Sequence, residues 1–133
     1  MIVVDTNVLA YHCLPGSRNA DTELLLQFDP EWAAPVLWRS EFRNLLCGYL
    51  RRGEMDFDQA REVIADAAES LKGGEHTVSD QAVMKLVAQS RCTAYDCEFA
   101  ALAAALGTVL VTEDKALLTS FPKLCRSLGR MIK

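Results

Sequence analysis

Four acidic side chains between residues 5 and 114 have the types and positions to hold a metal ion together. Asp5 directly follows the apolar segment Ile2–Val4, and Asp114 follows "TVLVTE", so each comes after a segment typical of a buried strand. Glu41 and Asp96 lie in segments whose apolar residues recur at helical spacing. Carboxylate oxygens are the ligands preferred by hard cations, so this set favours Mg²⁺ or Mn²⁺ over zinc or copper.

Glu41 also has a purely structural interpretation. It lies within or beside the apolar stripe of its predicted helix, where an unpaired charge is costly. A salt bridge to Arg39 or Arg43 would compensate that cost. Taken alone, this interpretation is the more ordinary one.

Asp96 and Asp114 fit helix N-termini equally well. "TAYD" has the pattern of a capping box, with Thr93 as the N-cap and Asp96 at the third helical position. Asp114 fits the first turn of a helix with Thr112 as its N-cap, where an acid complements the helix dipole.

Considered together, the four acids favour a shared cation. They come from four separate elements, and carboxylates that share a pocket need a counter-ion. The chain has 18 acidic and 14 basic residues, so without these four the count would be 14 against 14. The hypothesis therefore agrees with the charge balance.

Short apolar segments alternate with helical patterns along the chain, which predicts an α/β fold with a parallel sheet. At the carboxyl edge of such a sheet, loops and helix N-termini form ligand sites, and Asp5 and Asp114 stand at that edge. We expect strands at Ile2–Val4, Trp32–Pro35, Glu75–Val78 and Thr108–Thr112, and helices after residue 5 and over residues 21–28, 36–52, 57–71, 79–89, 95–106 and 113–118.

The composition predicts a single domain over residues 1–133, with 130–133 as a tail. No stretch has the length and apolarity of a membrane span, and no signal peptide is expected because Asp5 interrupts the apolar N-terminus. The five cysteines contain no CxxC pair, which favours reduced thiols in a cytoplasm. The net charge of −4 is not that of a passive nucleic-acid binder, but the bases near residue 41 and after residue 114 could contact a polyanion.

Four segments in order resemble the acidic motifs of PIN domains, in particular the small bacterial and archaeal ribonucleases of the VapC type. They are "IVVDTNVLA", "WRSEFRNLL", "TAYDCEFAALAAALG" and "VLVTEDKALL", and the resemblance covers roughly residues 1 to 128. It implies a three-layer α/β/α fold with a short, mainly parallel central sheet. It also implies that Asp5, Glu41, Asp96 and Asp114 form an acidic quartet that holds one or two divalent metal ions.

The same resemblance implies an activity and further residue roles. The expected reaction is metal-dependent hydrolysis of single-stranded or looped RNA that leaves a 5′ phosphate. Thr6, Asn7 and Thr112 match family motifs as residues that orient the carboxylates. Two further acids, Glu98 and Glu113, lie close enough in sequence to assist.

Partners and RNA contacts are also expectations from the resemblance. Proteins of the VapC type generally form homodimers and are held inactive by a small antitoxin, so this chain would be the toxin of such a pair. The candidates for contacts with the RNA backbone are Arg39, Arg43, Lys115 and Arg126.

Two other functions remain open on the sequence. One is an aspartate-based phosphotransfer or phosphatase domain of α/β type; its haloacid-dehalogenase form needs a second aspartate where this chain has Asn7, and its receiver form is only loosely matched by Lys115. The other is a non-catalytic binding module with a PIN-like fold. Binding of Mn²⁺ would distinguish the nuclease from the binding module.

Overall fold

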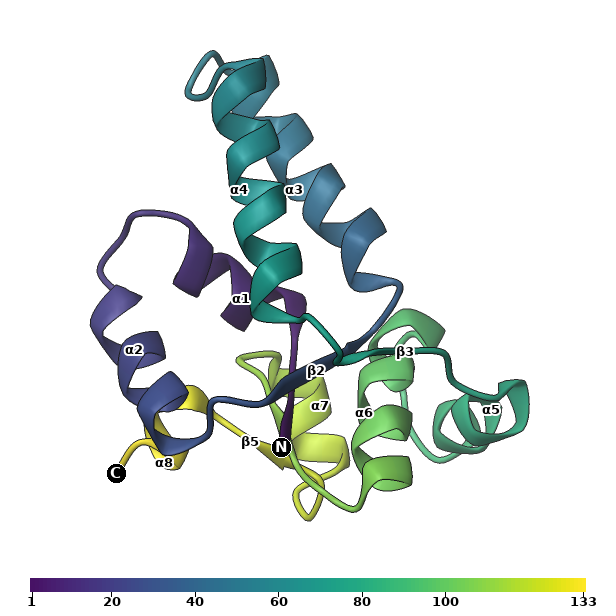
Figure 1. Cartoon of the computed structure of the whole chain (residues 1–133). Coiled ribbons are helices and arrows are strands. Elements are labelled where there is room, and N and C mark those ends of the chain that lie inside the picture. Colours follow the sequence, from purple (N-terminus) through teal and green to yellow (C-terminus); the bar gives the residue numbers. More distant parts are fainter.

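The computed structural model describes all residues from 1 to 133, and its centre is a parallel sheet of five strands (Figure 1). The strands lie in the order β3-β2-β1-β4-β5, and every neighbouring pair is parallel. The strands are β1 Ile2–Val4, β2 Trp32–Pro35, β3 Glu75–His76, β4 Leu110–Val111 and β5 Cys125–Arg126. The helices are α1 Thr6–Cys13, α2 Asn19–Phe28, α3 Trp38–Arg51, α4 Phe57–Ser70, α5 Asp80–Ala88, α6 Ala94–Leu106, α7 Lys115–Ser120 and α8 Leu128–Met131.

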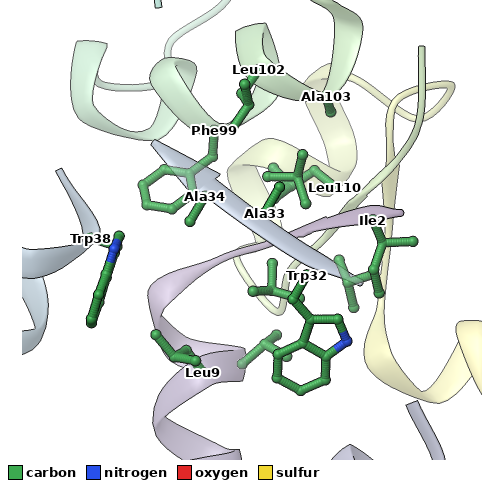
Figure 2. Packing of buried hydrophobic residues seen from close by; sticks show 14 of the residues in the cluster. Ile2, Leu9, Trp32, Ala33, Ala34, Trp38, Phe99, Leu102, Ala103 and Leu110 are labelled. Carbon is green, nitrogen blue, oxygen red and sulfur yellow. The ribbon is translucent and has the colours of Figure 1, made fainter. Parts of the chain in front are cut away.

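Helices cover both faces of the sheet, which confirms the predicted three-layer α/β/α fold. Phe99, Leu102 and Ala103 of α6 lie on one side of the strands, and Leu9 of α1 lies on the other side together with the Trp32 indole (Figure 2). The helices α3 and α4 pack side by side and extend away from the sheet (Figure 1). The buried core is therefore continuous through the sheet.

β1 is the central strand and determines where the acidic edge lies. It pairs with β2 through Val3 and Ala33 on one side and with β4 through Val3 and Leu110 on the other. All three residues of β1 are buried, as expected for a strand that is covered on both faces. The residue that follows β1 consequently lies between the carboxyl ends of two neighbouring strands.

Side-chain caps define the helices that reach this edge. The Thr93 hydroxyl accepts a hydrogen bond from the Asp96 N–H at 3.1 Å and starts α6. Gly107 ends α6 with φ of 66°, a left-handed conformation that costs glycine little. The helix thus begins and ends where its sequence signals predict.

The structure corrects several boundaries. The strand predicted at Glu75–Val78 ends at His76, and the one predicted at Thr108–Thr112 is limited to Leu110–Val111. The helix predicted over 113–118 begins at Lys115. β5 and α8 were not predicted. The expected tail at 130–133 is wrong in part, because α8 extends to Met131, and Met131 and Ile132 pack against the core.

Three apolar residues that the helical patterns include are exposed. Leu45 and Leu50 of α3 and Tyr95 of α6 have exposed fractions of 37%, 38% and 62%. Periodicity predicted their helices correctly, but it overestimated the width of the apolar stripes. None of the helices combines the length and apolarity that a membrane span requires.

Gly74 lies where two backbones approach closely, and this generates a test of the fold. A Cβ atom at position 74 would lie 2.1 Å from the Trp32 carbonyl oxygen. Gly74 immediately precedes β3, and its carbonyl oxygen accepts a hydrogen bond from Ala34 N of β2. We expect Gly74→Ala to lower the free energy of unfolding by about 2–3 kcal/mol, because backbone must shift to relieve the overlap. Urea unfolding of this variant measures the effect.

Gly129→Ala is the matched control for that variant. A Cβ atom there would meet nothing within 4 Å, and the residue lies in α8. Its stability should equal or slightly exceed that of the wild type. Equal stabilities of the two variants would contradict the close approach at Gly74.

Candidate active site

Asp5 is the most buried of the four predicted acids. It follows β1 and is the N-cap of α1, and its side chain accepts a hydrogen bond from Thr6 N at 2.8 Å. Its second oxygen accepts one from the Thr112 hydroxyl at 2.6 Å, while the Asp5 N–H donates to Val111 O at 3.0 Å. Only 6% of the residue is exposed. The carboxylate therefore joins the carboxyl ends of β1 and β4.

Glu41 is held by a hydroxyl group rather than by a cation. It lies in the first turn of α3 and is half-buried, and its Oε1 accepts a hydrogen bond from the Thr6 hydroxyl at 2.7 Å. The alternative interpretation, a salt bridge to Arg39 or Arg43, does not hold, because Arg39 pairs with Glu75 and Arg43 donates to the Ser40 hydroxyl. Glu41 thus keeps its negative charge uncompensated by any basic side chain.

Asp96 and Asp114 begin two further helices, although their caps differ from those predicted. The bond from Asp96 N to Thr93 confirms Thr93 as the N-cap of α6, but no return bond from the Thr93 N–H to the Asp96 carboxylate completes the box. Asp114 is itself the N-cap of α7 and accepts from Leu117 N at 2.9 Å. Thr112, predicted as that cap, instead accepts from Asp114 N at 3.0 Å and donates to Asp5.

The two threonines therefore connect three of the acids, while Asn7 does not. Thr6 donates to Glu41, and Thr112 lies between Asp5 and the Asp114 backbone. Asn7 makes no side-chain hydrogen bond to a carboxylate, and its buried Oδ1 has no partner at all. Its predicted role in orienting the carboxylates is not visible as a contact.

The acids influence one another electrostatically, so they lie in one neighbourhood. The pKa of Asp5 is raised to about 6, chiefly by burial; the hydrogen bonds from Thr112 and Thr6 lower it, and the charges of Glu41 and Asp96 add to the rise. Burial also raises the pKa of Glu41, with contributions from Asp96 and Glu98. The pKa of Asp96 is raised by burial and by Asp114. Each of the four acids therefore either raises the pKa of another acid in the set or has its own pKa raised by one.

The donor set fits a hard divalent cation by its chemistry. It consists of carboxylate oxygens with like charges, one of them deeply buried, which a metal ion would compensate. The positions do not enclose an ion, because no group of three or more histidine, cysteine, aspartate or glutamate side chains is arranged to hold a metal. The metal site itself stays a prediction.

The two additional acids have different environments. Glu98 is partly buried, its own pKa is raised by burial, and its charge raises the pKa of Glu41. Glu113 instead accepts a hydrogen bond from Leu128 N at 2.8 Å and one from Arg18 Nη2 at 3.4 Å. Glu98 therefore belongs to the acidic neighbourhood, whereas Glu113 anchors surrounding elements. No sequence signal indicated the bond between Glu113 and Arg18, whose positions are 95 residues apart.

The four basic residues predicted to contact RNA differ in how free they are. Lys115 and Arg43 are exposed, and Lys115 directly follows Asp114. Arg39 is bound to Glu75 and lies over the Trp38 ring. Arg126 donates to the Pro122 and Cys125 carbonyl oxygens. Lys115 and Arg43 are therefore more available than Arg39 and Arg126 for a contact with RNA.

Comparisons with known proteins identify the family and agree with the fold. Residues 2–123 match a family model described as the PIN domain. The chain is 28% identical over 126 residues to a protein named Ribonuclease VapC3 from Pyrobaculum aerophilum, and the match covers 92% of this chain and 96% of that protein.

Two solved structures are similar in fold. PAE2754 from Pyrobaculum aerophilum has a TM-score of 0.75 and 23% identity, over 98% of this chain and 88% of that one. FitAcB from Neisseria gonorrhoeae has a TM-score of 0.69 and 15% identity, over 97% of this chain and 99% of that one. At these identities the two structures support the fold alone.

The raised pKa of Asp5 generates a pH-dependent prediction. The folded protein binds the Asp5 proton more tightly than the unfolded chain, whose value is near 3.8. Raising the pH from about 4 to about 7 should therefore cost the metal-free wild type up to about 3 kcal/mol of stability at this residue. Asp5→Asn lacks that ionisation and should gain stability relative to the wild type over this interval.

Urea unfolding in the presence of a chelator, at several pH values between 4 and 7, measures this difference. Asp80→Asn is the control, because Asp80 is an exposed acid in the first turn of α5. A difference between Asp5→Asn and wild type that stays constant with pH would contradict the raised pKa.

Proposed function

Because the chain belongs to the PIN-domain family, we propose that it is a ribonuclease of the VapC type that hydrolyses RNA phosphodiesters with Mg²⁺ or Mn²⁺. The observation that carries the proposal is the buried Asp5 carboxylate, which lies in the same electrostatic neighbourhood as Glu41 and Asp96. Such a group of like charges from separate elements is unfavourable without a cation. The similarity to Ribonuclease VapC3 along almost the whole chain supports the choice of RNA as substrate.

In this proposal Asp5, Glu41, Asp96 and Asp114 hold the metal. A bound divalent ion would supply Lewis-acid activation of a water molecule and neutralise charge on the phosphoryl oxygens. The chain's own contribution is to fix the carboxylates: the hydrogen bonds from Thr112 to Asp5 and from Thr6 to Glu41 restrict which oxygens face the substrate.

Substrate binding has to overcome the negative charge of the site. Lys115 and Arg43 are exposed and would contact the RNA backbone, and Arg39 and Arg126 would do so only by giving up part of their present hydrogen bonding. Because such contacts are electrostatic, RNA binding should weaken as salt is added.

We also propose the biological setting that the VapC type implies. The chain would be the toxin of a toxin-antitoxin pair in the cytoplasm, bound by a small cognate antitoxin and forming a homodimer. The resemblance of the four acidic motifs and the similarity to Ribonuclease VapC3 support this setting. The free thiols of all five cysteines agree with a reducing compartment.

A non-catalytic binding module with the same fold is the competing hypothesis. One observation favours it, namely that the acidic side chains do not enclose a cation as they stand. Titration with Mn²⁺ separates the two hypotheses, because only the nuclease requires the acids to bind the ion.

Cleavage of RNA by the purified protein tests the proposal directly. We expect cleavage with Mg²⁺ or Mn²⁺, loss of activity in chelator, and a loss of at least about 100-fold in Asp5→Asn, because that variant keeps the size of the side chain but not its charge. Gel analysis of a labelled single-stranded RNA measures the rate. Asp80→Asn, an exposed acid on α5, should cleave like the wild type. Undiminished cleavage in chelator would reject the proposal.

A second test separates metal binding from helix capping at Asp96. Neutralising this residue relieves its repulsion with Asp114, so Asp96→Asn should leave the metal-free melting temperature unchanged or raised. Mn²⁺ at about 100 times its dissociation constant should stabilise the wild type by about 2.7 kcal/mol and the variant much less. Thermal melts with chelator and with Mn²⁺ measure both effects.

The capping interpretation expects the reverse outcome. Asp96→Asn would then lose up to about 1 kcal/mol at the start of α6, and Mn²⁺ would affect neither protein. Equal metal-induced shifts in the two proteins would remove Asp96 from the proposed metal site.

A further inference from the structure

A cavity of about 430 Å³ opens between α1, the segment that follows it, and α3. Asn7, Tyr11, Arg18, Leu45 and Tyr49 are among the residues that line it, and they belong to α1, the segment after it and α3. Asn7 is two residues beyond Asp5. Leu45 is one helical turn beyond Glu41, on the same side of α3. The walls of the cavity are thus continuous with elements that carry two of the acids.

The Asn7 amide contributes a buried polar atom without a partner to the wall of this cavity. Its Oδ1 is buried without any hydrogen bond, although buried polar atoms are nearly always paired. The terminal torsion of an asparagine side chain is soft, so a small rotation can turn the amide toward a ligand in the cavity. A carboxamide then offers one acceptor and one donor side by side.

The remaining walls favour a flat, largely apolar group. Tyr11 and Tyr49 supply aromatic rings, and Leu45 adds an aliphatic surface. Guanidinium groups lie 5.0 Å from the centre of each tyrosine ring, from Arg18 on Tyr11 and from Arg52 on Tyr49, which restrains both rings. Neither tyrosine hydroxyl is hydrogen-bonded within the chain, so both are available to a ligand or to water.

The charge of the cavity argues against a phosphate. Its cation, Arg18, donates to Asp21 at 3.1 Å and to Glu113 at 3.4 Å, so two carboxylates already neutralise it. A phosphate would find no unpaired cation there and would approach the acids of the neighbouring site. A neutral heterocycle avoids this repulsion.

We propose that the cavity binds an adenine base of the RNA substrate, next to the phosphodiester that the acidic site cleaves. The inference rests on the proposed ribonuclease function for the identity of the substrate. The carboxamide of Asn7 matches the N6 amine and the N7 acceptor of adenine, a pairing that asparagine makes with this base elsewhere. The tyrosine rings supply faces on which a base can stack.

Nucleoside binding to the metal-free protein tests the cavity without requiring cleavage. Adenosine is the probe, because it carries no phosphate that the acids would repel. NMR titration in chelator should shift the Leu45, Tyr11 and Tyr49 side-chain resonances. Inosine has the same ring system with an acceptor in place of the N6 amine, and it should bind about threefold to tenfold more weakly. Asn7→Ala should abolish that difference.

Two leucines of α3 provide a matched pair of variants. Leu45→Trp should weaken adenosine binding at least about tenfold, because the larger side chain occupies the space that the base needs. Leu50→Trp has the same chemistry on the same helix at almost the same exposure, 38% against 37%, but it lines a different groove, so it should bind adenosine like the wild type. Thermal melts confirm that both variants are folded.

Other outcomes would overturn the proposal. The cavity does not bind adenine if adenosine shifts no resonance of its walls, if inosine binds equally well, or if both tryptophan variants weaken binding to the same extent. Should Leu45→Trp leave adenosine binding and RNA cleavage intact but prevent capture of a protein partner, the cavity is a docking site for that partner instead. Adenosine binding by a wild type that cleaves no RNA would keep the base site and reject the ribonuclease function.

Discussion

Burial of the Asp5 carboxylate is the constraint on which the arrangement of the site depends. A carboxylate this deep in a protein is costly unless hydrogen bonds or a cation compensate it. Thr6 N and the Thr112 hydroxyl supply two hydrogen bonds, from the start of α1 and from the end of β4. The Thr6 hydroxyl then extends the network to Glu41 and so couples α3 to the central strands. The need to satisfy one carboxylate thus aligns three separate elements.

The central part of this fold could be predicted from the sequence because its signals are local and strong. Ile2–Val4 and Trp32–Pro35 are continuous apolar segments, and α6 lies between a threonine cap and Gly107. β5 could not be predicted in the same way. It has two residues, of which only Cys125 is apolar, and it exists because its backbone pairs with β4. The exposure of Leu45 likewise depends on which helix faces remain uncovered.

The four acids could be selected from the sequence as candidates, whereas their immediate hydrogen-bond partners could not. Threonine and aspartate are both good N-cap residues, so the order of Thr112 and Asp114 left the choice of cap open. The choice depends on a residue 107 positions away in the sequence: the Thr112 hydroxyl donates to Asp5, and Asp114 is the N-cap of α7. The alternative partner considered for Glu41 was a neighbouring arginine, but its partner is the Thr6 hydroxyl. Tertiary contacts of this kind leave no local pattern.

The position of β1 at the centre of the sheet has a consequence for synthesis on the ribosome. β1 is the first strand to be made, but its pairing with β4 requires residues 110–111, and Thr112 is itself held by a bond to Arg126 O. Contacts between such distant parts of a chain form late, because a long loop must close first. A nascent chain therefore lacks assembled neighbours for Asp5 until the segment from residue 110 to residue 126 has left the exit tunnel. The same topology that brings the acids together also delays their assembly during synthesis.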